Sequence, residues 1–341
     1  MEQKVSDKPT WRPTNPHDRF CRATVFHPKY APDFLRSFGD PVLVKYVDLD
    51  HLQEAPTIQL SGELKEVIMD ASLVTRLLDT KSMTEVLLHL EHKSRPSLTV
   101  LVQLLLEVAL SMHFRWVVNN RTESGGFVPP IPLMVVVYNG SEDWDGEICF
   151  QDLFPDLPEE LRSLVPQFRV IFINLRRFQY GKLPGKPETQ AIAESLMRAT
   201  DGTFIDHLSS VFKHVAESSL DEQGRFDLTK TISFYCTWAA KAQPEMINQA
   251  ISNVFREQEY QKMIEEISNS LILEGIAIGE ARGKVEGKID AILQLLRIRF
   301  NRVPGYVAEG LTERTDLVAL DSLFDLAAQC ESIEVFVNAL K

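Results

Sequence analysis

Two short apolar runs constrain the fold of this chain more than any other feature. Residues 133–138 read Leu-Met-Val-Val-Val-Tyr and stop at Asn139-Gly140, and residues 170–175 repeat the pattern. Such a run is typical of a strand buried on both faces, in a sheet covered by helices. Apolar residues between 98 and 112 recur at spacings of three and four, which predicts an amphipathic helix running to about Trp116. We therefore expect mixed α/β layers rather than a barrel.

Further elements precede this helix. Apolar residues between His17 and Phe38 predict one helix, or two that are interrupted at Pro28 and Pro32. Three short runs rich in apolar and β-branched residues follow, separated by turn-like segments, and predict successive strands at Thr57–Leu60, Val67–Leu73 and Val86–Leu90. The expected order is helix, three strands, helix, strand and a further strand.

The chain changes character after about residue 182, where strand patterns give way to helical ones. Helical patterns cover Thr203–Ala216, Ile232–Ala242 and Met246–Ile272. A chain of 341 residues is long enough for two or three domains. We expect a disordered tail at 1–16, an α/β domain at 17–181, a helical region at 182–272 and a helical C-terminal region at 273–341.

Glycine occupies every fourth position at the start of the C-terminal region, at Gly275, Gly279, Gly283 and Gly287. A glycine inside a helix costs roughly 0.5–1 kcal/mol. If the segment is helical, the four glycines form one ridge that lets another backbone approach closely, which favours a partner helix from a second copy and hence a homodimer. The alternative is a flexible linker. A separate form of this region, starting at an internal methionine, is a further hypothesis.

The composition is that of a soluble globular chain, with 44% hydrophobic and 25% charged residues. The four cysteines are far apart, with no C-x-x-C pair, so we expect reduced thiols. The polar start lacks the apolar segment of a signal peptide, and the longest apolar stretch is interrupted by Gln103 and Glu107. We therefore expect a cytoplasmic protein with no membrane partner.

A carboxylate and a lysine stand two residues apart at the end of the third predicted strand. Because strand side chains alternate between faces, Glu91 and Lys93 project to one side and His92 to the other. Asp70 lies on the neighbouring predicted strand. Two carboxylates and an ammonium at the edge of a sheet suit Mg²⁺, which prefers carboxylate and water oxygens, and the lysine would help to activate a metal-bound water.

An Asp followed after about twenty residues by Glu-x-Lys, across two strands, resembles the core of the PD-(D/E)XK nucleases. More specifically, the chain is similar to the recombination-promoting nuclease (Rpn) family of transposase-like proteins. This similarity covers most of the chain, and the segments that carry it are His17-Asp18, Leu90–Ser94, Pro132–Gly140, the glycine-rich segment, Leu295–Phe300 and Pro304. The order of these motifs and the flanking strands give the resemblance its weight.

The resemblance implies a restriction-endonuclease-like (PD-(D/E)XK) mixed sheet flanked by helices. It also implies an endonuclease that cleaves phosphodiester bonds of DNA with Mg²⁺ or Mn²⁺. Asp70 and Glu91 would then hold the metal, and Lys93 would orient the attacking water, so that all three are catalytic. The biological roles that it suggests are recombination, movement of mobile elements or defence against phage.

Alternatives remain open at each of these positions. A Glu-x-Lys pair on a strand is often a solvated ion pair worth about 0–1 kcal/mol, and an inactive nuclease fold would serve as a scaffold for protein partners. Asp18 and Glu63 are either further ligands or ordinary cap and edge residues, and Gln103 lies either near the phosphate or on the polar side of a core helix. His89 and His92 face opposite sides of a strand, which disfavours a zinc site, and His92 is interpreted as structural.

The formal net charge of -12 argues against a protein that simply coats nucleic acid. The acidity is unevenly distributed, however. Residues 1–140 hold 15 basic and 16 acidic side chains, whereas residues 141–341 hold 21 and 32. The expected catalytic half is thus nearly neutral, which permits a weak, metal-bridged contact with DNA at one face.

Overall fold

The computed structural model describes residues 16–55, 71–78, 84–113, 129–144, 148–301, 303–312, 314 and 316–340. Two compact units divide the chain, one within Asn15–Ile264 and one built on Glu265–Lys341. The helices that follow residue 182 up to Ile264 therefore pack in the same unit as the sheet. The domain boundaries at 181 and 272 that the sequence predicts stay predictions.

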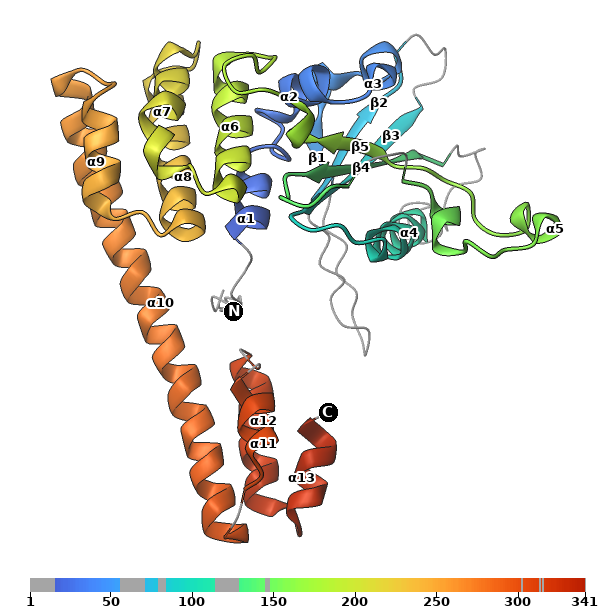
Figure 1. The fold of residues 1–341 in the computed structure, drawn as a ribbon, viewed down its shortest axis with the longest axis vertical. Coiled ribbons are helices and arrows are strands. Elements are labelled where there is room, and N and C mark those ends of the chain that lie inside the picture. Colours follow the sequence, from blue (N-terminus) through green and yellow to red (C-terminus); the bar gives the residue numbers. More distant parts are fainter. Residues whose placement is uncertain are drawn as a thin grey trace, which may run out of the picture. The chain divides into compact units, whose positions relative to one another are not determined.

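Five strands form one mixed sheet in the order β1-β2-β3-β4-β5 (Figure 1). Their bounds are Gln53–Glu54, Ala71–Arg76, Glu85–Lys93, Ile131–Tyr138 and Ile171–Asn174. Strand β2 pairs antiparallel with both β1 and β3, whereas β3, β4 and β5 run parallel. Parallel neighbours need a crossover connection, and the one between β3 and β4 contains helix α4 (Thr99–Met112). The architecture is a mixed sheet with flanking helices, compatible with an α/β nuclease-like fold.

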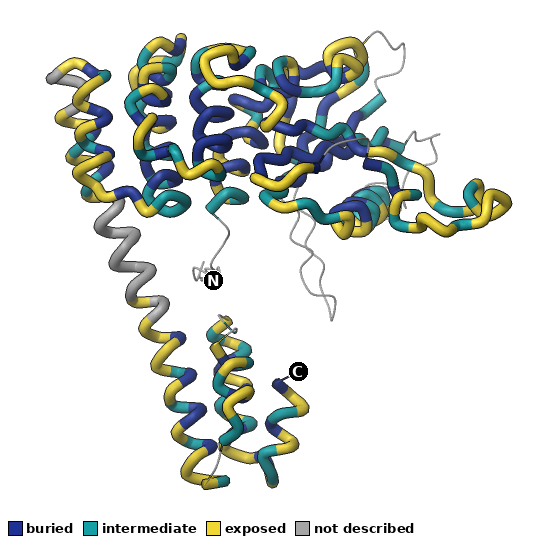
Figure 2. Tube along the Cα trace, viewed as in Figure 1, coloured by how far each residue is buried: buried dark blue, intermediate teal, exposed yellow. Residues whose placement is uncertain are grey.

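Burial follows the apolar runs of the sequence (Figure 2). Strand β3 is buried from Val86 to His92, and β4 from Met134 to Tyr138. The strands expected at 133–138 and 170–175 are confirmed, since β5 lies within the second range. The third expected strand continues past Leu90 to Lys93, so that the whole Glu-x-Lys motif is in a regular strand. The strand expected at Thr57–Leu60 lies outside the described residues.

The first expected helix is interrupted, as its prolines indicated. Helix α1 (Pro16–Ala23) contacts α8 (Glu222–Ala240), where Phe20 stacks on Tyr235 with ring centroids 4.0 Å apart. The remaining helices of this unit are α2 (Ala31–Phe38), α3 (Pro41–Tyr46), α5 (Glu159–Arg162), α6 (Pro187–Asp201), α7 (Leu208–Glu217) and α9 (Pro244–Ser252), with short 3-10 turns at Leu49–His51, Phe150–Leu153, Leu175–Arg177 and Ile205–His207. Several of them begin with proline, whose fixed φ suits the first helical turn.

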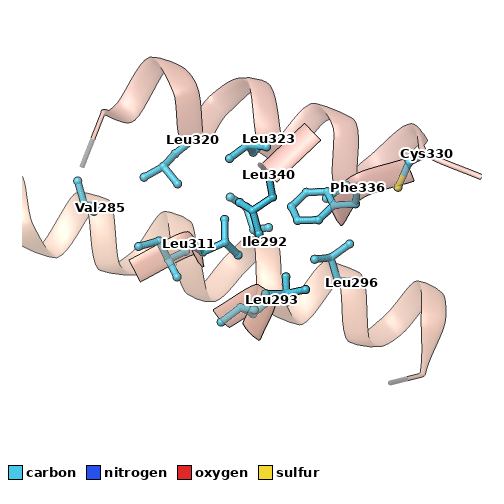
Figure 3. Packing of buried hydrophobic residues seen from close by; sticks show 13 residues of the cluster. Val285, Ile292, Leu293, Leu296, Leu311, Leu320, Leu323, Cys330, Phe336 and Leu340 are labelled. Atoms are coloured by element: carbon cyan, nitrogen blue, oxygen red, sulfur yellow. The ribbon is translucent and has the colours of Figure 1, made fainter. Parts of the chain in front are cut away.

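Helix α10 (Glu257–Phe300) is continuous through all four glycines, so the linker interpretation is wrong. The end of α10 packs with α11 (Gly305–Thr312), α12 (Leu317–Gln329) and α13 (Ile333–Leu340). Figure 3 shows their shared core, in which Ile292, Leu296 and Phe336 are fully buried. This core uses residues of the C-terminal unit only. Within the part of the chain that the structure describes, no helix combines the length and apolarity needed to cross a membrane.

Candidate functional site

Strand β3 directs its two sets of side chains to opposite sides of the sheet. Glu91 and Lys93 face α4, where both contact Gln103. His92 faces α1, where it contacts Asp18. The alternation that the sequence predicted is thus observed, and it separates a Glu91 side from a His92 side.

Three hydrogen bonds join Glu91, Lys93 and Gln103 into a closed triangle. Lys93 Nζ donates to Glu91 Oε2 at 3.0 Å and to Gln103 Oε1 at 3.3 Å. Gln103 Nε2 donates to Glu91 Oε1 at 2.7 Å. The Glu91 side chain is only 1% exposed and that of Lys93 is 23% exposed, so this pair is not a solvated surface ion pair. A buried carboxylate is costly unless a cation and hydrogen bonds stabilise it, and here both do.

The polar cluster continues behind this triangle. Gln103 Nε2 also lies 3.3 Å from Oε1 of Glu107, a fully buried carboxylate one turn further along α4. Oε2 of Glu107 lies 3.9 Å from Nδ1 of His89, and that nitrogen lies 3.2 Å from Ser72 Oγ. Burial lowers the pKa of His89 to about 4, so its imidazole is neutral at physiological pH.

Sequence reasoning did not assign roles to Glu107, His89 or Ser72. A signal for Glu107 was present, because it follows Gln103 by four residues in an otherwise apolar helix and therefore lies on the same helical face. Ser72 had no such signal, since its place depends on the pairing of Ser72 with His89 across β2 and β3.

Asp70 and Glu63 lie outside the described residues. Ala71, the residue after Asp70 in the sequence, pairs with Leu90 on β3. Among the residues that the structure describes, no three His, Cys, Asp or Glu side chains gather as possible metal ligands. Of the two expected metal ligands, only Glu91 is therefore observed, and the structure brings it together with Lys93 and Gln103.

His92 is held by both ring nitrogens on the other side of the sheet. Nδ1 lies 2.9 Å from Asp18 Oδ1, and Nε2 lies 2.8 Å from Asn139 Oδ1. The Asn139 amide donates from Nδ2 to the carbonyl oxygen of Leu196, which leaves its oxygen facing the ring. Nε2 is therefore the donor to Asn139, and Nδ1 faces the Asp18 carboxylate. The structural interpretation of His92 is confirmed, and Asp18 is its partner rather than a ligand beside Glu91.

His17 and Tyr235 extend this second cluster. His17 stacks on His92 with ring centroids 5.8 Å apart, and its Nδ1 lies 2.6 Å from the Tyr235 hydroxyl oxygen. Burial and the nearby His92 lower the pKa of His17 to about 4, against the opposing effect of Asp18. Burial raises the pKa of Tyr235 well above its usual value. The tyrosine is therefore the donor and the neutral histidine the acceptor.

The two sides of β3 are suited to different tasks. The His92 side consists of contacts between elements of the fold. The Glu91 side combines a carboxylate, which binds hard cations, with an ammonium that can neutralise negative charge on a phosphate. The Glu91 side is therefore the candidate functional site.

Comparison with known proteins identifies a family that covers the part of the chain carrying this site. A family model described as "Putative transposase, YhgA-like" matches residues 15–224, more than half of the chain. This range includes all five strands, α4 and both sides of β3. No curated protein and no solved structure matches the chain.

Proposed function

Because the chain belongs to the YhgA-like transposase family, which includes the recombination-promoting nucleases, we propose that it is a metal-dependent DNA endonuclease with a PD-(D/E)XK core. The observation that carries this proposal is the buried Glu91 carboxylate with Lys93 Nζ at 3.0 Å. An ordinary surface ion pair would not be buried in this way. A carboxylate hydrogen-bonded to an ammonium, at the end of a parallel strand, is suited to phosphodiester hydrolysis.

The residues present fit a hard divalent cation, Mg²⁺ or Mn²⁺. The Glu91 carboxylate accepts hydrogen bonds from Lys93 and Gln103, and carboxylate oxygens are the ligands that these ions prefer. Glu91 and Asp70 would hold the ion, since Asp70 directly precedes the residue that pairs with Leu90. When bound, the ion would polarise the phosphate and lower the pKa of a water ligand.

The other two side chains of the triangle, Lys93 and Gln103, would have separate roles in catalysis. Lys93 orients the attacking water and neutralises the negative charge that develops on the phosphate. Gln103 holds the Glu91 carboxylate in one orientation and also accepts a hydrogen bond from Lys93. Its role is that of a positioning residue. The near-neutral charge of residues 1–140 is compatible with one DNA-binding face.

The proposal also includes the oligomeric state of the protein and its location in the cell. A homodimer would form through the glycine ridge of α10, and the protein would act in the cytoplasm on DNA. Recombination, movement of mobile elements and phage defence are the roles that fit such an enzyme.

The test is nicking of supercoiled plasmid DNA with Mg²⁺. Asp70→Ala, Glu91→Ala and Lys93→Ala should each lose at least about 100-fold in rate, in the range of a lost charge-stabilising group. Glu85→Ala, on the same strand, and the exposed Lys213→Ala are matched controls that should keep full activity. Equal activity in the wild type and the three site variants would rule out the assignment.

Metal titration distinguishes this proposal from an inactive scaffold that binds protein partners. Calorimetry should detect binding of Mn²⁺ to the wild type and loss of that binding in Glu91→Ala. An inactive scaffold would bind no metal at this position, and neither the wild type nor Glu91→Ala would nick DNA.

A further inference from the structure

A pocket of about 260 Å³ lies near the candidate site and has no role in the chemistry described above. The segments after β4 and β5 and the end of α6 line it. Its chemistry depends on six of these lining residues, namely Asn139, Ser141, Arg176, Phe178, Tyr180 and Asp201. All of them belong to the sheet unit.

The pocket and the catalytic strand meet at the same edge of the sheet. Strands β3, β4 and β5 are parallel and in register, with Lys93 paired with Tyr138 and Tyr138 with Asn174. In open α/β sheets, ligands bind outside the carboxyl ends of parallel strands. Lys93 ends β3 at this edge, and the pocket begins one residue beyond Tyr138.

Direct contacts connect the pocket wall to β3. The backbone nitrogen of Asn139 donates to the carbonyl oxygen of Lys93 at 3.3 Å. The side chain of Asn139 holds His92, which faces the side of the sheet opposite to Glu91 and Lys93. The backbone bond to Lys93 joins the pocket wall to the end of β3, so a DNA strand with a phosphate at Glu91 and Lys93 would reach the pocket around the carboxyl end of β4.

The lining of the pocket combines aromatic rings with a cation. Phe178 and Tyr180 contribute aromatic rings to the lining, of the kind on which bases stack, and the Arg198 guanidinium already lies over the Tyr180 ring, 4.0 Å from its centroid. Arg176 Nη1 lies 3.0 Å from Asp143 Oδ1, in an ion pair whose side chains are 39% and 91% exposed. Such an exposed pair is weak, so a phosphate can replace its carboxylate at little cost. Asp201 accepts hydrogen bonds from the Tyr180 hydroxyl and from the backbone nitrogen and hydroxyl of Thr203, which fix this wall of the pocket.

We propose that this pocket binds one unpaired nucleotide of the DNA strand, next to the phosphate that is cleaved. The base stacks on Phe178 or Tyr180, and its phosphate pairs with Arg176. Ligand pockets usually measure roughly 300–1,000 Å³, so this smaller one holds a single nucleotide. The inference rests on the proposed endonuclease function and assigns the substrate class, DNA with an unpaired or displaced nucleotide at the cut.

Binding of mononucleotides to the full chain, without metal, tests the pocket separately from catalysis. Deoxynucleoside 5′-monophosphates and inorganic phosphate would be titrated by calorimetry. We expect wild type to bind at least one mononucleotide, and Arg176→Ala to bind it at least 10-fold more weakly. Ser141→Trp, which fills the pocket from an exposed position, should have the same effect.

Two controls locate the bound nucleotide. Arg162→Ala removes an arginine that pairs with exposed Glu159 at 3.0 Å, outside the pocket lining, and should leave binding unchanged. Glu91→Ala should also leave it unchanged. The inference would be overturned if the wild type bound no mononucleotide, or if either control variant lost as much affinity as Arg176→Ala. It would also be overturned if inorganic phosphate at the same concentration displaced the mononucleotide.

The outcomes also separate this inference from the endonuclease proposal. An inactive protein that binds mononucleotides through Arg176 would overturn the endonuclease and leave the pocket as a nucleotide site. An active nuclease without such binding would overturn the pocket alone. With an active enzyme, a duplex carrying a single-nucleotide bulge should be cut at least 10-fold faster than a fully paired one, and Arg176→Ala should remove this preference.

Discussion

Gln103 is the residue whose amide contacts both members of the proposed catalytic pair, Glu91 and Lys93. It donates to Glu91 at 2.7 Å and accepts from Lys93 at 3.3 Å. Removal of a hydrogen bond to a charged group costs about 1.5–3 kcal/mol. Gln103→Ala should therefore lower the nicking rate roughly 10–100-fold, since each 1.4 kcal/mol is a factor of ten. The loss should appear in kcat rather than in DNA binding.

A second glutamine provides the matched control. Gln223 donates to Asp227 at 2.9 Å, four residues further along a helix, but on an exposed surface. Gln223→Ala should have full activity. If the two variants lose activity equally, or if neither does, Gln103 does not position the site.

His17 makes the stability of the fold depend on pH. Its folded pKa of about 4 is below the ordinary histidine pKa of 6.5, so the unfolded chain binds the proton more readily between these two pH values. The stabilisation is therefore present above pH 6.5 and is lost as the pH falls toward 4, by up to roughly 3 kcal/mol. His17→Gln keeps an acceptor for Tyr235 without a titrating ring. Urea unfolding at pH 7, 5.5 and 4.5 should show a smaller loss for this variant than for wild type.

Tyr235→Phe separates titration from the hydrogen bond itself. This variant loses the bond at every pH but keeps the buried histidine, so its curve should be lower than that of wild type and equally steep. Identical slopes for wild type and His17→Gln would show that other groups cause the acid sensitivity.

The sequence predicted only part of the site at this scale. The opposite directions of Glu91 and His92 follow from strand alternation alone. The partners of His92 do not, because Asp18 and Asn139 come from separate elements that meet only through tertiary packing. Glu107 is intermediate, since its shared face with Gln103 is a helical property but its contact with His89 is tertiary.

At the scale of elements, prediction succeeded where burial gives a simple pattern. Strands β4 and β5 are buried on both faces and follow directly from continuous apolar runs. Helix α6 was missed because its buried surface includes polar groups, among them the Glu194–Arg198 ion pair at 2.6 Å, which hide the helical period. The break at residues 253–256 divides one expected helix into α9 and the start of α10.

The glycines of α10 allow a test of the ridge. A Cβ added at Gly283 or Gly287 would meet no other atom within 4 Å. Gly283→Ala and Gly287→Ala should therefore stabilise the C-terminal unit by about 0.5–1 kcal/mol each, measured by thermal unfolding at low protein concentration. Gly310→Ala in α11 is the matched control without this gain, because its Cβ would lie 3.1 Å from Leu340.

The proposed homodimer predicts a second effect of the same positions. If another α10 backbone approaches the ridge, a large side chain must separate the two helices. Gly283→Leu and Gly287→Leu should weaken self-association at least 10-fold in sedimentation equilibrium while the monomer remains folded. A wild type that is monomeric at all concentrations, or variants that associate normally, would contradict the proposed dimer.

The whole molecule contains a C-terminal core that is independent of the sheet unit. The residues of this core all lie between Val285 and Leu340. Leu296 is fully buried in it, so Leu296→Ala should cost about 2–5 kcal/mol and lower the unfolding transition of this unit alone. Ile298, on the same helix, is 73% exposed, and Ile298→Ala should change little. Calorimetry of the full chain should show two transitions, with the one from the sheet unit unchanged and plasmid nicking retained at 25 °C. A single transition that shifts as a whole in Leu296→Ala would mean that the two units unfold together.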